Sequence, residues 1–259
     1  MKSIVDTFFN FLLNQLYRIG QFGLFLQHSF SSLFSTQSEW KETAKQCYLI
    51  GYKTLPLVGI TGFIMGLVLT IQTRPTLSDF GAESWLPAMV SVSIVREIGP
   101  VITALICAGK VGSGIGAELG SMNVTEQIDA MEVSGTNPFN YLVVTRILAC
   151  AFMLPLLTIY NDIISMLGSF MGVNIMGEVS LRLFFASALS EISFLDIFSS
   201  LIKTFFFGLA IGIISTYQGY YAQKGTVGVG AAANASVVIS SLLIFILDMV
   251  AVQISSLFS

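Results

Sequence analysis

The stretch TLPLVGITGFIMGLVLTIQT, from Thr54 to Thr73, contains no charged residue and decides the fold class of the whole chain. A helix needs about 20 mostly apolar residues to cross a bilayer, and this stretch has that length and composition. The rest of the chain agrees, because 54% of its 259 residues are hydrophobic and only 10% are charged. Soluble domains carry about 25% charged residues. The sequence therefore predicts an integral membrane protein.

Four further stretches have the length and hydropathy of membrane spans, and polar or charged residues interrupt most of them. We expect the five spans at Thr54–Thr73, Trp85–Ala108, Tyr141–Val173, Ile197–Tyr217 and Ala231–Ser255. At ~1.5 Å per residue the third is longer than the hydrocarbon core, so it should tilt, kink or project. The predicted fold is an all-α membrane protein with five transmembrane helices.

The region before the first span is predicted to lie in the membrane interface. Its apolar residues recur on one helical face, and polar residues interrupt every run that is long enough to span a bilayer. That face contains Ile4, Val5, Phe8, Phe9, Leu12, Leu13, Leu16 and Ile19. A packed core helix is the alternative. We expect residues 1–45 to form this helix and a connector, and residues 46–259 to form the membrane domain.

Basic residues predict the orientation. Five spans place the two termini on opposite sides, and loops rich in Lys and Arg stay in the cytoplasm. With a cytoplasmic N-terminus, only Arg74 and Arg182 lie outside. The residues then inside are Lys2, Arg18, Lys41, Lys45, Lys53, Lys110, Arg146 and Lys224. We therefore predict a cytoplasmic N-terminus and an external C-terminus.

Several classes of function find no support in the sequence. The net charge of −3 provides no basic surface for nucleic acid. The three cysteines are read as buried thiols, and His28 is the only histidine, so we expect no metal. The segment AGKVGSG has valine after its lysine, where a Walker A motif needs Ser or Thr, and no H-E-x-x-H or G-x-S-x-G occurs. We expect no cofactor, and we do not expect the chain to be an enzyme by itself.

A glycine-rich, polar segment, Gly109–Gly135, separates the second and third spans. Small residues recur in it every four positions, at Ala108, Gly112, Gly116 and Gly120. On a helix this spacing forms a smooth strip that another backbone can approach closely. A flexible glycine-rich loop is the alternative, and the regular spacing favours the helix.

The second half of this segment predicts a short amphipathic helix over Asn123–Val133. Asn123 can cap its start, with Glu126 three residues later, and Gly135 can end it. One arc holds Val124, Ile128 and Met131, and another holds Glu126, Asp129 and Glu132. Either arc could dock a cytoplasmic partner, and a merely solvated acidic face is the simpler alternative.

Several motifs in the same region resemble those of the MlaE/YrbE permease family. These are R-E-x-G-P at Arg96–Pro100, A-G-[KR] at Ala108–Lys110, A-E-[LI]-G at Ala117–Gly120, T-E-Q at Thr125–Gln127 and L-P-L-L-T at Leu154–Thr158. The resemblance covers roughly Gly51 to Leu257. Members of this family are the membrane subunits of MCE-associated ABC transporters that move phospholipids.

The resemblance implies a homodimeric permease, and we expect it in a bacterial inner membrane, with an organelle envelope of similar ancestry as the alternative. It also implies a cytoplasmic ABC ATPase, which would bind the ATP, and an MCE-domain protein on the outer side that exchanges phospholipid with it. The segment between spans two and three would then contact the ATPase. We assign this coupling role to Glu118, Val124, Glu126, Ile128, Asp129, Met131 and Glu132.

Charges inside the predicted spans are the candidate substrate-cavity or gating residues. They are Arg96, Glu97, Asp162, Lys203 and Asp248. A charge at the centre of a bilayer costs about 2.5–3.5 kcal/mol, so such groups normally face a cavity or a partner. Pro100 leaves the Arg96 carbonyl without its helical donor, which favours a kink beside polar groups. Charges that merely hold the bundle together are the alternative.

The resemblance places Glu97 near a central cavity and, more weakly, Arg96 with it. We expect Glu97 to be the acid closest to Arg96 and Lys203. A stand-alone secondary transporter is a competing function, although five spans divide poorly into two repeats. A non-transporting membrane scaffold is another, but it would not explain charges buried in the membrane.

Overall fold

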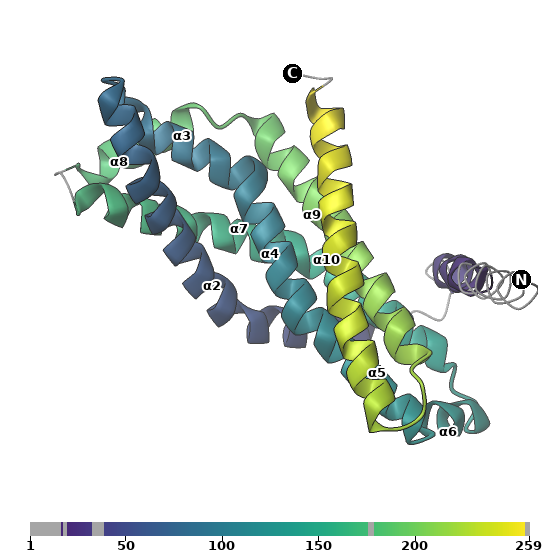
Figure 1. Cartoon of the computed structure of the whole chain (residues 1–259). Coiled ribbons are helices and arrows are strands. Elements are labelled where there is room, and N and C mark those ends of the chain that lie inside the picture. Colours follow the sequence, from purple (N-terminus) through teal and green to yellow (C-terminus); the bar gives the residue numbers. More distant parts are fainter. Residues whose placement is uncertain (1–16, 18–19, 33–38, 176–178, 257–259) are drawn as a thin grey trace, which may run out of the picture.

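The computed structural model describes residues 17, 20–32, 39–175 and 179–256, and all regular structure in these ranges is helical (Figure 1). Within them, five helical stretches are long and apolar enough to cross a membrane. They are Trp40–Asp79, Glu83–Val124, Phe139–Asn174, Phe194–Tyr220 and Thr226–Ser255. The prediction of an all-α fold with five transmembrane helices is confirmed.

The helices extend well beyond the apolar runs that predict them. The first span is a single helix, α2 (Trp40–Asp79), of 40 residues. At 1.5 Å per residue such a helix is about 60 Å long, or about twice the hydrocarbon thickness. Hydropathy therefore marks the part of α2 that lipid can surround, whereas its helical ends continue outside that layer.

Two π-helical turns interrupt the second span. After a short 3₁₀ turn, η1 (Glu83–Trp85), it consists of α3 (Leu86–Ser93), a π-helical turn η2 (Ile94–Ile98), α4 (Gly99–Cys107), a second π-helical turn η3 (Ala108–Gly112) and α5 (Ser113–Val124). The predicted distortion at Pro100 is present: the N–H of Gly99 bonds the carbonyl of Ile94, five residues back. The glycine-rich strip is helical, as its spacing predicts.

The short helix after this span, α6 (Gln127–Val133), begins later than predicted. Asn123 does not cap it, because α5 continues through that residue and its amide instead donates to the carbonyl of Ala222. The chain turns at Glu126, whose φ of 58° is left-handed. The end agrees with prediction: Gly135 has a φ of 80° and its N–H bonds the Glu132 carbonyl, as in a Schellman ending.

The third span joins a π-helical turn, η4 (Phe139–Val144), to α7 (Thr145–Asn174). A short apolar helix, α8 (Leu181–Ser190), follows and was missed in the sequence. Its ten residues are too few to span, so a search for long apolar runs passes over it. Phe184 and Ala188 of α8 pack against Leu86 and Val90 of α3.

The remaining spans are α9 (Phe194–Tyr220) and α10 (Thr226–Ser256). α2 lies along α7, α7 packs on α9, and α10 packs on both α9 and α5 (Figure 1). The core between them includes Cys107, Leu154, Phe207 and Ile211. Cys107, Cys150 and the half-buried Cys47 are free thiols, as expected.

One end of the bundle carries α6 and the loop between α9 and α10, and the opposite end carries α8 and the last turn of α10 (Figure 1). The apolar face predicted to lie in the membrane interface, Ile4 to Ile19, falls outside the described residues. Residues 20–32 form a helix whose Phe25 is 2% exposed and packs against Phe139 and Tyr217. The division into residues 1–45 and 46–259 stays a prediction.

Candidate functional site

Lys203 is the centre of a cluster of charges between the second span, α9 and α10. Its side chain is only 5% exposed, and its Nζ lies 2.8 Å from Oε2 of Glu97 and 3.1 Å from Oδ1 of Asp248. It also donates a hydrogen bond of 2.8 Å to the backbone carbonyl of Arg96. An ammonium group has three donors, so these three acceptors satisfy it fully.

The bond to the Arg96 carbonyl follows from Pro100. A proline has no N–H, so the carbonyl four residues before it loses its helical donor. An unpaired carbonyl is costly inside a membrane. Here the chain forms a local π-helical turn, and Lys203 donates the hydrogen bond that the carbonyl would otherwise lack. The sequence predicts polar groups beside this carbonyl, and the structure shows that Lys203 is the donor.

Arg96 has a different partner. Its Nε lies 2.7 Å from Oδ1 of Asp196, in the first turn of α9. Asp196 also accepts from the backbone N–H of Ser193, which forms a capping box that fixes the carboxylate in place. The expectation that Glu97 is the acid closest to Arg96 and Lys203 therefore holds for Lys203, which Asp248 also contacts, but is wrong for Arg96, which pairs with Asp196 instead.

The cluster is open on one side. The Arg96 side chain is 54% exposed and that of Glu97 is 44% exposed, whereas Asp248 is 19% exposed. When all groups are ionised, Lys203 with its two acids carries a net charge of −1, and the Arg96–Asp196 pair is neutral. Charged groups within membrane spans are normally found facing a partner or a polar cavity.

Asp162 does not join this cluster. It lies on α7 against Gly99, and its Oδ1 is buried without a hydrogen-bond partner. The neighbouring Asn161 donates a long bond of 3.4 Å to the Gly99 carbonyl. Of the five charges predicted to line a cavity, the structure thus brings together Arg96, Glu97, Lys203 and Asp248, and places Asp162 apart from them.

The two arcs of the α6 region face different surroundings. Ile128 is 4% exposed and belongs to the main core, with Met131 packed partly buried against it and Val124 half-buried. The acidic arc, Glu126, Asp129 and Glu132, is exposed. The apolar arc therefore packs back on the bundle, and the acidic arc is the one left for a partner.

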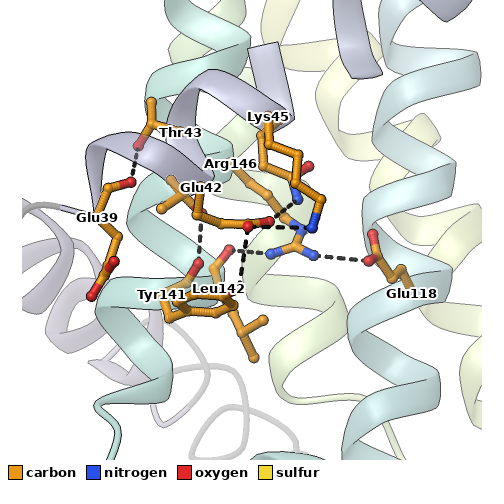
Figure 2. Close-up of polar contacts among 10 residues, drawn as sticks. Glu39, Glu42, Thr43, Lys45, Glu118, Tyr141, Leu142 and Arg146 are labelled. Atoms are coloured by element: carbon orange, nitrogen blue, oxygen red, sulfur yellow. Dashed lines mark hydrogen bonds and ion pairs between the residues drawn. The ribbon is translucent and has the colours of Figure 1, made fainter. Parts of the chain in front are cut away.

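Two polar networks attach the neighbours of α6 to the rest of the bundle (Figure 2). Arg146, 2% exposed, donates 2.9 Å bonds to the Leu142 carbonyl and to Oε1 of Glu118 on α5. On the other side, Tyr141 donates to Oε2 of Glu42 near the start of α2, at 3.2 Å. These pairs connect α5 to α7 and η4 to α2 in the region next to α6.

The three glycines of the predicted strip lie at helix contacts. A methyl group on Gly112 would meet Ser215 and Ile211 of α9, and one on Gly116 would lie 3.1 Å from the Ala232 carbonyl oxygen of α10. A methyl group on Gly120 would lie 3.2 Å from Cβ of Ala222. Close approach of α5 to both α9 and α10 depends on these positions.

Sequence reasoning missed Asp196 and the partners of Glu118 and Tyr141. A signal for Asp196 existed, because Ser193-Phe194-Leu195-Asp196 has the spacing of a capping box at the start of a helix. The contacts of Glu118 with Arg146 and of Glu42 with Tyr141 join residues 28 and 99 positions apart. No local pattern announces such pairs.

Comparison with known proteins agrees with this architecture. The family described as Permease MlaE matches residues 43–254. A probable ABC transporter permease protein of Rickettsia typhi is 37% identical over 228 residues, which are 88% of each chain. A protein of the same description from Synechocystis sp. is 36% identical over 206 residues, or 80% of this chain and 78% of that protein. The chain belongs to the MlaE permease family.

Proposed function

We propose that this chain is the membrane subunit of an ATP-driven transporter that moves phospholipid. Membership in a permease family supports the first part, as does the description of its relatives as probable ABC transporter permease proteins. The sequence contains no Walker A motif, so the ATP site is assigned to a separate ATPase. The chain itself then needs no cofactor.

The observation that carries the proposal is the open side of the Lys203 cluster. A single chain would place the half-exposed Arg96 and Glu97 side chains against lipid tails, which is costly. A second copy of the chain facing this side would cover them and enclose a polar region between apolar walls. Such a lining suits a molecule with a charged headgroup and apolar chains, and it makes the homodimer part of the transport path.

The two ends of the bundle are assigned to two partners. The acidic arc of α6 is exposed beside the networks of Glu118 and Glu42, so the ATPase docks at that end. The end with α8 and the C-terminus then lies outside, where an MCE-domain protein exchanges phospholipid with the permease. We assign the chain to a bacterial inner membrane, as its bacterial relatives favour, with its N-terminus in the cytoplasm.

Reconstitution tests the function. The chain is purified in mild detergent with the P-loop ATPase that copurifies with it, placed in vesicles, and assayed for ATP-dependent transfer of a fluorescent phospholipid to acceptor vesicles. We expect transfer to depend on ATP and to fall in Glu97→Gln, with Glu83→Gln near the end of α2 as the control. A complex that hydrolyses ATP but transfers no phospholipid would refute the substrate.

Cysteine labelling tests the orientation separately. A cysteine placed at Lys224, in the exposed loop between α9 and α10, should react with a membrane-impermeant maleimide only from the cytoplasmic side. A cysteine at Ser259 should react only from the outside. The reverse labelling pattern would show that the α8 end faces the cytoplasm, and it would contradict docking of the ATPase at the α6 end.

A further inference from the structure

A cavity of about 360 Å³ lies where the helix of residues 20–32 meets the end of α6 and the end of α9. Most of its wall is aromatic, and one carboxylate, Glu132 of α6, stands at it. Its lining includes Phe25, His28, Phe139, Tyr220, Tyr221 and Glu132. None of them belongs to the Lys203 cluster, so the cavity is a separate feature of the α6 end.

The aromatic wall is continuous and fixed by packing. The ring centroids of Phe25 and Phe139 are 5.2 Å apart, those of Phe139 and Tyr220 are 5.9 Å apart, and those of Tyr220 and Tyr221 are 5.4 Å apart, all edge to face. Phe25 and Phe139 are 2% and 8% exposed, so they are held in place by the bundle. Tyr221 is 51% exposed and stands at the open side.

The charges around the cavity favour a cation. The faces of aromatic rings attract cations, and a carboxylate beside them adds to that attraction. Among the described residues that line the cavity there is no Lys or Arg, and Glu132 takes part in none of the ion pairs found between described residues. A phosphate group would need a base here, and the one histidine, His28, has its ring packed edge to face on Phe139 at 4.2 Å.

The position of the cavity indicates the source of the cation. It adjoins the exposed acidic arc of α6, which the proposed function assigns to the ATPase, so one partner surface would cover both. We propose that an arginine or lysine side chain of the ATPase inserts into this cavity between the helix of residues 20–32 and α6. The helix of residues 20–32 is then part of the docking surface. This inference rests on the proposed function.

Crosslinking of the complex tests the insertion. A photoreactive phenylalanine analogue replaces Leu24, a 67% exposed residue at the cavity, in the purified complex of the chain with its ATPase. The same analogue at Val133, 91% exposed on α6, reports docking on α6 alone, and at Phe194, at the far end of α9, it is the negative control. We expect ATPase adducts at Leu24 and Val133, with the Leu24 adduct mapping beside an arginine or lysine.

The other outcomes separate the two proposals. Adducts at Val133 without adducts at Leu24 would leave ATPase docking intact and overturn the cavity proposal. Adducts of Leu24 with lipid in place of ATPase would overturn it as well. ATPase adducts at neither position would remove α6 as the docking element and overturn the cavity proposal with it, while the reconstitution assay would still decide the transport function.

Affinity measurements test the chemistry of the cavity. Glu132→Gln keeps the shape of the side chain and removes its charge, and Tyr221→Leu keeps an apolar wall and removes the aromatic face. We expect each to weaken ATPase binding about tenfold, which is the range of a charge-assisted bond or a cation–π contact. Glu191→Gln, an exposed acid at the other end of the bundle, is the matched control. Binding unchanged in both test variants would refute the insertion of a cation.

Discussion

Replacing Lys203 by methionine should destabilise the bundle, because Glu97 and Asp248 both depend on it. Their oxygens lie 2.8 and 3.1 Å from the same nitrogen. The two oxygens are therefore at most about 6 Å apart, and two unit charges at that separation repel each other by about 3 kcal/mol at an effective dielectric constant of about 20. The Arg96 carbonyl also loses its donor.

Together these effects predict a loss of about 3–5 kcal/mol, the range for removing one partner of a buried ion pair. The Glu97 side chain is 44% exposed, so part of the repulsion is relieved by water and the lower end of that range applies. Thermal unfolding of the purified chain in detergent measures the change. The triple variant Lys203→Met, Glu97→Gln, Asp248→Asn removes the repulsion and should recover most of the stability.

The same pair of variants separates a structural role from a functional one. If the charges contact a headgroup, the triple variant should fold, bind the ATPase and hydrolyse ATP, yet transfer phospholipid at no more than about a tenth of the wild-type rate. Transfer at the wild-type rate in the triple variant would show that the charges only hold the helices together. A stable Lys203→Met variant would contradict the geometry itself.

Three further sets of substitutions test other parts of the structure. Ile128→Asp should lower the stability of the fold, because Ile128 is 4% exposed. Val133→Asp on the same helix should leave unfolding unchanged, because Val133 is 91% exposed. Equal melting curves for the two variants would contradict the packing of α6 described above. Reversing Glu126 and Asp129 to Lys should reduce ATPase pull-down without lowering stability, and full retention would exclude docking by the acidic arc. Gly116→Ala should cost about 1–3 kcal/mol against backbone atoms of α10, while Gly114→Ala, with nothing within 4 Å, should cost nothing, and equal unfolding of the two would contradict the helix contact.

The fold could be predicted from the sequence because each span carries its own signal. An apolar run of sufficient length has to become a helix in lipid, since its backbone groups find partners only within the helix itself. This holds for α2, α9 and α10 without any knowledge of their neighbours. This rule does not find α8, because its ten residues are too few to span a bilayer. The position of α8 is set instead by Phe184, which packs against α3.

Local sequence patterns also predict part of the candidate site. Pro100 alone implies an unpaired Arg96 carbonyl, and Gly135 alone implies the end of α6. The cap at Asn123 was predicted wrongly, because a capping pattern competes with the continuation of α5. Once α5 reaches the loop after α9, the Asn123 amide gains more from the Ala222 carbonyl, 99 residues away, than from a cap.

The choice of partner for each charge lies beyond local rules. Lys203 meets Glu97 and Asp248 across 106 and 45 residues, and Arg96 prefers an acid at the start of α9 that no burial argument singles out. The cost of burial predicts that such charges must be paired. Which residue pairs with which is decided by how the second span, α9 and α10 pack together. The same reasoning extends past a single chain. The incomplete burial of Arg96 and Glu97 calls for a covering surface that one copy does not provide, and this is the reason for proposing a homodimer.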